Sequence, residues 1–320
     1  MRFLASAFFC FAAACAASPN AGTAASISSA EPRGPIRHVI LVTVDGLVPE
    51  AYLHPDAHGL KTPALRYIVE NGAVSSGARS VFPSVTYPSH TSMATGVYPA
   101  RHGVTTNLAF DPLEKNLGGW RWYAEDLKSP PLWELARRAG YQTALVSWPA
   151  TVGAGATWLF PEYWRARNDE DRKLLRAVST PGLLDDVARV HADLYANLFP
   201  EPNDEAMGDI ATYVLEHGKP HLTMVHLVDV DQAQHAHGLW SAQATYAIEN
   251  ADRQLGRMLE SAHGAGLWPH FAIVVASDHG FAGVTRRLRP GVLLLFQGHG
   301  HVRFPQDVCS LVGRLGAEKR

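Results

Sequence analysis

Short apolar runs alternate along the chain with segments in which apolar residues recur every three or four positions. Residues 38–44 form a nearly continuous run of β-branched and aliphatic side chains, and similar runs cover 143–147, 222–228 and 271–276. Such runs are typical of strands that are buried on both faces of a sheet. The pattern therefore predicts a core built around a buried sheet.

Helical segments separate these strands. One helix is expected from Pro63 to Gly72, because Thr62 can cap it, Pro63 suits the first turn and Gly72 can end it. A second covers 129–139 and is closed by Gly140, and a long third, at about 241–262, carries small and aliphatic residues at helical spacing. Strands that alternate with helices predict an α/β fold with a mostly parallel central sheet and helices on both faces.

Acidic residues stand at the ends of three predicted strands. Asp45 follows the first strand, Asp231 lies just beyond the run 222–228, and Asp278 follows the last strand. Ligands of such sheets bind beyond the carboxyl ends of the strands, so the fold would bring these acids together. Read alone, Asp45-Gly46 and Asp278-His279-Gly280 are also ordinary turn sequences.

Carboxylates and imidazoles at these strand ends suggest a metal site. Asp278 and His279 are adjacent in the sequence. Asp231 and His235 lie four positions apart, which can bring both side chains to one ion on a helical turn or a tight loop. Zinc accepts both carboxylate oxygen and imidazole nitrogen. Less favoured positions nearby are Asp229, as an alternative ligand to Asp231, and His226 and His237, as outer partners or solvated side chains.

A segment rich in hydroxyl side chains, residues 81–96, carries the candidate nucleophile. Thr86 is followed two positions later by Pro88, which belongs in the first turn of a helix. A hydroxyl at a helix N-terminus faces backbone N–H groups and the positive end of the helix dipole, where an anion or an alkoxide is stabilised. A metal ion beside it would activate it as a nucleophile. The alternative interpretation is a Thr- and Ser-rich capping segment.

Taken together, the motifs resemble the nucleotide pyrophosphatase/phosphodiesterase family of the alkaline phosphatase superfamily. The matching motifs are Asp45-Gly46, Thr62-Pro63, Phe82-Pro83-Ser84-x-Thr86-x-Pro88-x-His90, Thr95-Gly96-x-Tyr98-Pro99-x-x-His102-Gly103, Asn107, Pro131-Leu132-Trp133, Trp148-Pro149, Asp231-x-x-x-His235-x-x-Gly238 and Ser277-Asp278-His279-Gly280. They occur in the family's order, and their joint occurrence is far more specific than any one of them. The resemblance implies an alkaline phosphatase-like, three-layer α/β sandwich.

The resemblance also implies a hydrolase of phosphodiester or pyrophosphate bonds that uses two zinc ions. Thr86 would attack phosphorus and form a covalent phospho-threonine intermediate, and Asn107 would hydrogen-bond a phosphoryl oxygen. The implied zinc ligands are Asp45, Thr86, Asp278 and His279 at one ion and Asp231 and His235 at the other.

The sequence around Thr86 separates the chain from other members of the superfamily. Sulfatases need Cys or Ser in a C/S-x-P-x-R frame, whereas this frame reads Thr86-Tyr87-Pro88-Ser89-His90. Monoesterases add a cationic clamp, for which Arg165 and Arg167 are loose candidates unless they form a solvated basic pair. Diesters or pyrophosphates are favoured, and a phosphomonoesterase on the same scaffold is the alternative. Aromatic side chains that could stack on a substrate, or belong to the core, are Trp158, Tyr163 and Trp164.

Composition narrows the range of partners. The 320 residues are 47% hydrophobic and 18% charged, as in ordinary globular proteins. The formal net charge of −2 creates no global field for a nucleic-acid polymer, so we expect a small-molecule phosphodiester or nucleotide substrate. The three cysteines, Cys10, Cys15 and Cys309, predict no disulfide framework.

The first residues predict export. Residues 1–17 have a positive start, an apolar run too short to span a bilayer and a cleavage site at Ala14-Cys15-Ala16, which together indicate a signal peptide. A buried N-terminal helix and a lipid anchor at Cys15 are the alternatives. Residues 18–35 are interpreted as a flexible leader. No second hydrophobic span follows, so a periplasmic or secreted enzyme is expected.

The resemblance fades near the C-terminus. The expected catalytic domain covers 36–290, and 291–320 are interpreted as a divergent or truncated tail. The family supplies a late histidine to the second zinc, and His299 and His301 are weak substitutes for it. A truncated, inactive relative with an incomplete second site and an uncovered sheet edge is therefore the non-enzymatic alternative.

Overall fold

The computed structural model describes residues 35–109, 119–163, 168–199 and 201–284 of the chain. Several expectations from the sequence lie outside the described residues. These are the signal peptide, the leader except for Pro35, the C-terminal tail, the anchor position Cys15, the clamp candidates Arg165 and Arg167, the aromatic Trp164, and the late histidines His299 and His301.

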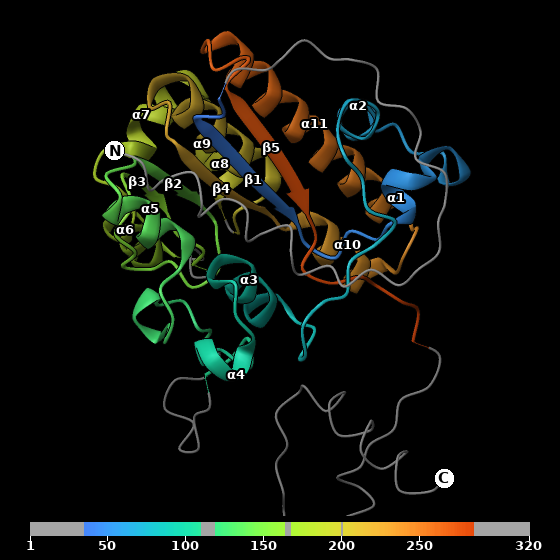
Figure 1. Cartoon of the computed structure of the whole chain (residues 1–320), viewed down its shortest axis with the longest axis horizontal. Helices are drawn as coiled ribbons and strands as arrows, with labels where there is room; N and C mark the ends of the chain where they lie inside the picture. The colour runs from blue at the N-terminus through green and yellow to red at the C-terminus, as the bar shows by residue number, and fades with distance from the viewer. Residues whose placement is uncertain (1–34, 110–118, 164–167, 200, 285–320) are drawn as a thin grey trace, which may run out of the picture. The chain divides into compact units, whose positions relative to one another are not determined.

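A five-stranded sheet forms the centre of the described molecule (Figure 1). Its order is β3-β2-β4-β1-β5, and every pairing between neighbouring strands is parallel. The strands are β1 (His38–Val44), β2 (Thr143–Val146), β3 (Trp158–Phe160), β4 (Leu222–Leu227) and β5 (Phe271–Ala276). The predicted parallel α/β sheet is thus confirmed.

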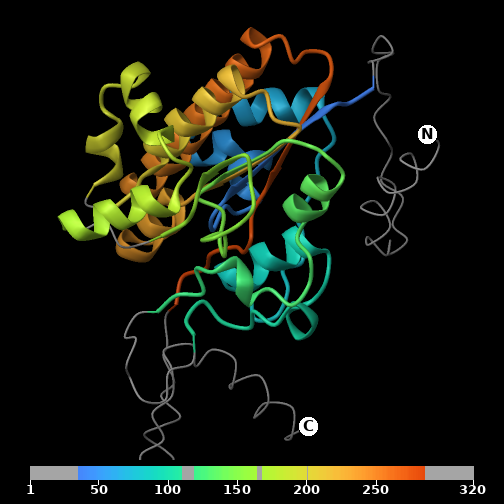
Figure 2. The same cartoon turned by 90° about the vertical axis from the view of Figure 1, so that its left-hand side faces the viewer.

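Helices cover both faces of the sheet. Figure 2 shows α9 and α11 on one face, with α3 and α5 on the other. The helices are α1 (Glu50–Leu53), α2 (Pro63–Asn71), α3 (Thr86–Thr95), α4 (Pro99–His102), α5 (Leu132–Arg138), α6 (Asp169–Val178), α7 (Leu183–Val190), α8 (Leu194–Leu198), α9 (Asp204–His217), α10 (Asp229–His237) and α11 (Ala242–Gly264), with short 3-10 turns η2 (Pro55–His58) and η3 (Ala124–Asp126). The arrangement is the expected three-layer sandwich.

The alternation of strand side chains divides the core in two. Ile40 and Val42 of β1 point into the larger cluster, which includes Leu255 of α11. Residues such as Leu145 and Met224 point the other way, into the smaller cluster. Burial of both faces explains why the strand sequences are nearly continuous apolar runs. Among the described strands, β5 is an edge, and its Val274 is 47% exposed.

Several elements differ from the sequence-based expectations. Residues after β4 form the regular helix α10, and the helices between 168 and 217 were not foreseen. Thr62 precedes α2 but makes no capping hydrogen bond. Instead, the buried carboxylate of Asp252 on α11 accepts from the backbone N–H groups of Ala64 and Leu65, at 3.1 and 2.7 Å. None of the helices in the described residues has the length and apolar character needed to cross a membrane.

Candidate active site and metal centre

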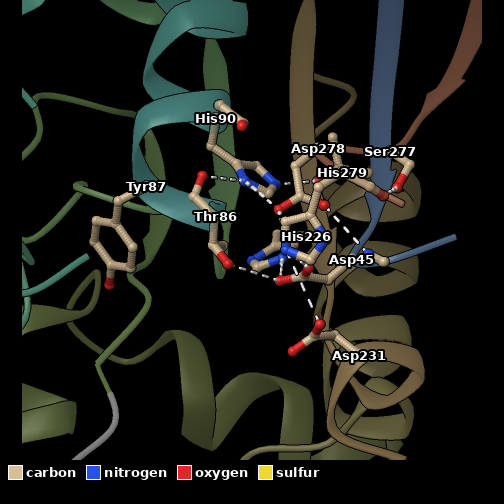
Figure 3. A network of polar contacts seen from close by, with 12 residues as sticks. Asp45, Thr86, Tyr87, His90, His226, Asp231, Ser277, Asp278 and His279 are labelled. Carbon is tan, nitrogen blue, oxygen red and sulfur yellow. Dashed lines mark hydrogen bonds and ion pairs between the residues drawn. The ribbon is translucent and has the colours of Figure 1, made fainter. Parts of the chain in front are cut away.

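The carboxyl ends of β1, β4 and β5 bring the predicted acids together (Figure 3). Asp45 directly follows β1, and Asp278 and His279 follow β5. Asp231 lies in the first turn of α10, directly after β4. Gly46, with a φ of 69°, makes this approach feasible, because a Cβ there would lie 3.3 Å from an Asp231 carboxylate oxygen. The predicted convergence of distant acids therefore occurs.

Asp45, Asp278 and His279 form a group that could hold a metal ion. Their ligand atoms all lie within 4.8 Å of one another. The His279 Nε2 atom is 3.2 Å from Asp45 Oδ1 and 3.4 Å from Asp278 Oδ2. The other Asp278 oxygen accepts a hydrogen bond from the Gly46 N–H at 3.2 Å. Two carboxylates and one imidazole in this arrangement form a donor set suited to zinc.

Unsatisfied oxygens show that the donor set fits a cation. Asp45 Oδ1, Asp231 Oδ1 and Asp278 Oδ2 are all buried and have no hydrogen-bond partner among the described residues. Buried carboxylate oxygens rarely lack such partners, because their desolvation is then uncompensated. A divalent cation placed among them would provide the missing interaction. The three oxygens belong to residues that follow three different strands, Asp231 in the first turn of α10 and the others directly after β1 and β5, and a shared ion would lie among them.

Burial and the close approach of the carboxylates shift the pKa values of Asp278, Asp231 and His279. Burial, and then the nearby carboxylate of Asp45, raise the pKa of Asp278. Burial also raises the pKa of Asp231. For His279, burial alone would lower the pKa, but Asp278, Asp45 and Asp231 together outweigh it and raise the pKa. Protons therefore compete with a cation for these ligands.

Thr86 lies beside this group at the first position of α3. Its Oγ1 donates to Asp45 Oδ2 at 3.4 Å. In the first turn of the helix, the Tyr87 N–H donates to Asn107 Oδ1, Pro88 has no N–H, and the Ser89 N–H donates to the Val85 carbonyl, so what the helix end offers the hydroxyl is chiefly the positive end of its dipole. The hydroxyl thus has a carboxylate on one side and a helix N-terminus on the other. Such a position suits both a nucleophile and the anion it attacks.

His90 fixes the first turn of α3. It is fully buried, and its Nδ1 lies 2.9 Å from the carbonyl oxygen of Thr86. Its Nε2 lies 2.9 Å from the Thr43 hydroxyl on β1. Burial, and then the neighbouring His226, lower the pKa of His90 to about 3. A neutral imidazole with the proton on Nδ1 therefore ties the turn that carries Thr86 to β1.

Asn107 lies next to the candidate nucleophile. Its Oδ1 accepts from the backbone N–H of Tyr87 at 2.9 Å. Because the carbonyl side of the amide is anchored there, the amide nitrogen remains the group that can donate to a ligand beside Thr86. This placement is consistent with the role that the sequence predicts for Asn107.

Asp231 and His235 form a looser pair on one face of α10. The His235 Nε2 atom is 3.4 Å from Asp231 Oδ1, and its side chain is 68% exposed. The same Asp231 oxygen lies 4.0 Å from His279 Nε2. Asp231 therefore lies between His235 and the buried group, which is the geometry that a second ion would need. The two residues are together, as the spacing predicts.

Asp229, the alternative ligand, is engaged elsewhere. Its Oδ2 accepts from the backbone N–H of Asp204, at 3.1 Å. In return, Asp204 Oδ1 accepts from the N–H groups of Val228 and Asp229, at 2.7 and 3.2 Å. Burial raises the pKa of Asp229 to about 6. The pair links the N-termini of α9 and α10, which supports the preference for Asp231 as the ligand.

The sequence reasoning missed Glu162, whereas His226, which it named as an outer partner or a solvated side chain, lies buried beside Asp45 as an outer partner. The fully buried His226 lies 3.2 Å from Asp45 Oδ2 and 2.7 Å from Glu162 Oε2. Burial would lower the pKa of His226, but hydrogen bonds to Asp45 and Glu162 raise it well above its ordinary value. Glu162 follows the short strand β3. The rule that acids after strands meet at one edge could have found it, had that strand been recognised.

The described members of the suggested aromatic slot have other neighbours. The Trp158 ring lies against Gly218, where a Cβ would be only 2.7 Å from it. Tyr163 packs edge-on against Trp122, with 4.8 Å between the ring centroids. Both side chains serve packing in this structure, which matches the core interpretation of these aromatics.

Comparison with known proteins adds evidence independent of this geometry. A sequence model of the type I phosphodiesterase/nucleotide pyrophosphatase family matches residues 39–318. The chain belongs to this family. The family assignment agrees with the resemblance carried by the motifs around Asp45, Thr86 and Asp278.

Individual family members are distant relatives. Ectonucleotide pyrophosphatase/phosphodiesterase family member 1 of Mus musculus is 24% identical over 251 residues, which cover 75% of this chain and 24% of that protein. Family member 5 of Homo sapiens is 24% identical over 250 residues, which cover 76% of this chain and 44% of that protein. The chain thus matches less than half of the length of either relative.

Solved structures share the fold. Murine family member 5 in complex with AMP matches with a TM-score of 0.50 and 23% identity, covering 76% of this chain and 57% of that chain. Phosphonoacetate hydrolase from Sinorhizobium meliloti 1021 in complex with phosphonoacetate matches with a TM-score of 0.54 and 25% identity, covering 84% of this chain and 63% of that chain. Both likenesses agree with the alkaline phosphatase-like fold.

Proposed function

We propose that this chain is a metal-dependent hydrolase of phosphodiester or pyrophosphate bonds in small molecules, and that Thr86 is its nucleophile. One observation carries the proposal. The Thr86 hydroxyl lies 3.4 Å from Asp45, which belongs to the metal-capable group, at the N-terminus of a helix in a chain of this family. A candidate nucleophile, a group that could hold a cation and the positive end of a helix dipole therefore share one location.

The proposed reaction begins with in-line attack of the Thr86 oxygen on phosphorus. The new oxygen–phosphorus bond replaces the bond to the leaving alcohol or phosphate, which gives a phospho-threonine intermediate. Water then cleaves that intermediate and restores the hydroxyl. Asp45 accepts the hydrogen bond of the hydroxyl before attack, and Asn107 donates to a phosphoryl oxygen.

We propose two zinc ions as the cofactors. Asp45, Thr86, Asp278 and His279 would hold one ion, and Asp231 and His235 would contribute to the other. When bound, the ions would stabilise negative charge on the attacking and leaving oxygens. The three buried carboxylate oxygens without hydrogen-bond partners support this assignment. The exposed position of His235 makes the second site the weaker of the two.

The family and the names of the relatives favour diesters or pyrophosphates over monoesters. A monoester carries an additional negative charge that normally needs a cationic partner. The proposed substrate is a phosphodiester or a nucleotide with a pyrophosphate bond. In support, the curated relatives are named nucleotide pyrophosphatases/phosphodiesterases.

We also propose that the enzyme acts after export, in the periplasm or outside the cell. The signal-like pattern of residues 1–17 supports this location, as do the names of the relatives, which are ectonucleotide enzymes.

A substrate panel tests the proposed function. Purified protein should hydrolyse a p-nitrophenyl phosphodiester faster than the matching monoester, lose activity with a chelator and recover it with zinc. Phosphonoacetate belongs in the panel because a structural neighbour binds it. The Thr86→Ala variant should lose turnover by about a thousandfold or more. Faster turnover of the monoester would favour the phosphomonoesterase alternative, and no turnover by folded, zinc-loaded protein would contradict the proposal.

A further inference from the structure

Polar groups cross the carboxyl edge of the sheet in the order of its strands. Glu162 follows β3, Ser147 follows β2, His226 lies near the end of β4, and Asp45 follows β1. His279, beyond β5, continues the row through its 3.2 Å contact with Asp45. His226, on the central strand β4, therefore links the metal-capable group beside β1 and β5 to Glu162, which follows β3 on the other side of the sheet.

The two ring nitrogens of His226 have different neighbours. Nδ1 lies 2.7 Å from Glu162 Oε2 and 3.2 Å from the carbonyl oxygen of Ser147. Nε2 lies 3.2 Å from Asp45 Oδ2. All these atoms are oxygens, so the ring acts as a donor on both sides. The side chain is fully buried, and water does not compete for these bonds.

The backbone conformation of Ser147 directs its carbonyl oxygen toward His226 Nδ1. Its φ is 53°, in the left-handed region that few residues other than glycine adopt. Its own N–H donates to the carbonyl of Phe160 at 2.7 Å, which ties the end of β2 to β3. In this conformation the Ser147 carbonyl faces His226. An uncommon backbone conformation next to a buried polar chain is frequent at functional sites.

The hydrogen bond between His226 Nε2 and Asp45 Oδ2 orients the Asp45 carboxylate. Asp45 Oδ2 accepts from His226 and from the Thr86 hydroxyl, whereas Asp45 Oδ1 has no hydrogen-bond partner in the described part of the chain and lies 3.2 Å from His279 Nε2. Holding one oxygen fixes the rotation of the carboxylate. The other oxygen is thereby directed toward the metal-capable group, as outer partners do for metal ligands in general.

We propose that His226, braced by Glu162 and the Ser147 carbonyl, is a positioning residue that sets the orientation of Asp45 for metal binding. The inference rests on the proposed function, because it assigns Asp45 to a metal site. It adds a chain of contacts, Glu162–His226–Asp45, that runs from the end of the edge strand β3 to the metal-capable group.

Metal affinity is the direct readout. Zinc affinity is measured with a competing chelator, and cobalt(II) is used as a probe because its visible absorption reports on the surrounding ligands. His226→Leu should weaken zinc binding by about 10- to 100-fold and change the cobalt spectrum. His226→Gln, whose amide can still donate to Asp45, should restore most of the affinity. Equal losses in the Leu and Gln variants, or parent-like affinity and spectrum in folded His226→Leu, would overturn the proposal.

Glu162 provides a second, independent series if His226→Leu does not fold. Glu162→Leu removes the acceptor for Nδ1 and should weaken zinc binding about 10-fold, whereas Glu162→Gln keeps an oxygen there and should have a smaller effect. The double variant with His226→Leu should bind no more weakly than His226→Leu alone, because both act through one contact. Parent-like zinc affinity in Glu162→Leu would overturn the proposal.

Two controls separate the outcomes. His102 is equally buried, its ring hydrogen-bonds the Ser92 hydroxyl and the Val104 N–H, and it is none of the proposed metal ligands, so His102→Gln should lower thermal stability and leave zinc affinity unchanged. Asp45→Asn tests the metal site itself. If Asp45→Asn also binds zinc like the parent, the metal centre of the proposed function fails. If it loses zinc while His226→Leu keeps it, only the positioning role fails.

Discussion

At the scale of residues, the site is defined by which atoms are satisfied and which are not. Asp45 has one oxygen held by two donors and one without a hydrogen bond. Asn107 is anchored through its oxygen, which leaves its nitrogen to donate. In each case a polar group is fixed on one side and open on the other. This asymmetry is what a preorganised catalytic site requires.

Asn107 allows a prediction about turnover. Asn107→Asp keeps an oxygen for the Tyr87 N–H but replaces the amide donor with a second oxygen, so kcat should fall about 100- to 1,000-fold while KM changes less. Steady-state kinetics on the p-nitrophenyl diester measure this. Asn71→Ala is the control, because Asn71 is an exposed asparagine whose amide donates to the Tyr67 carbonyl. A parent-like kcat in Asn107→Asp would remove the residue from the mechanism.

His279 allows a prediction about pH. Because its pKa in the metal-free protein is raised above 6.5, the ring is protonated at mildly acidic pH and must lose that proton to bind a metal. Zinc affinity should therefore rise as pH increases through the raised pKa, with proton release on binding. The contribution of His279 to metal-free stability has the opposite trend: it is present below 6.5 and is lost as pH rises through the raised pKa.

Calorimetric zinc titrations in buffers of different ionisation enthalpy measure the proton release, and urea unfolding in the presence of a chelator measures the stability. The His279→Gln variant should show a weaker pH dependence in both experiments. Zinc affinity that does not change between mildly acidic and mildly alkaline pH would contradict the assignment of His279 as a ligand.

At the scale of elements, helix ends place the chemistry. The N-terminus of α3 carries Thr86, and the first turn of α10 carries Asp231. The paired carboxylates of Asp204 and Asp229 tie the N-termini of α9 and α10 to each other. Because α10 begins directly after β4, this pairing also fixes Asp231 relative to the sheet.

The capping of α2 gives a stability prediction. Asp252→Ala removes the acceptor of the Ala64 and Leu65 N–H groups and should lower the free energy of unfolding by about 1–2 kcal/mol. Thr62→Val is the matched control: the buried Thr62 hydroxyl has no hydrogen-bond partner within residues that the structure describes, so its removal should be neutral or slightly stabilising. Thermal and urea unfolding measure both. A larger loss in Thr62→Val than in Asp252→Ala would show that Thr62 is the cap.

The sequence predicted the elements that carry strong local signals. The strands β1 and β5 have the expected bounds, and the others that were predicted differ by a residue. The three-residue strand β3 was missed because so short an apolar run has no periodicity. Glu162 was missed with it. The capping of α2 by Asp252 is a long-range contact between α2 and α11, which local sequence around Thr62 does not encode.

For the site as well, the sequence predicted some residues and not the contacts of others. Motif spacing and strand ends indicated Asp45, Asp231 and Asp278, because these depend on position along the chain. The place of His226 depends instead on the order of strands in the sheet, where β4 lies between β2 and β1. That order brings its ring between Glu162 and Asp45, and no pattern near residue 226 specifies it.

At the scale of the whole molecule, all of the proposed chemistry lies at the carboxyl ends of the parallel strands. The strands are parallel, so their carboxyl ends lie together, and the loops and helices that follow them supply every proposed ligand. The amino ends of the strands contribute packing residues such as Trp158, the first residue of β3. The architecture of the family thus explains how acids more than a hundred residues apart reach one cation site.

The most direct test of the account is to trap the covalent intermediate. Zinc-loaded protein is quenched in acid during turnover of a phosphodiester, digested and analysed by mass spectrometry. We expect one added phosphate-containing group on the peptide from α3, located on Thr86 and absent from the Thr86→Ala variant. A label on another residue, or sustained turnover by Thr86→Ala, would contradict it.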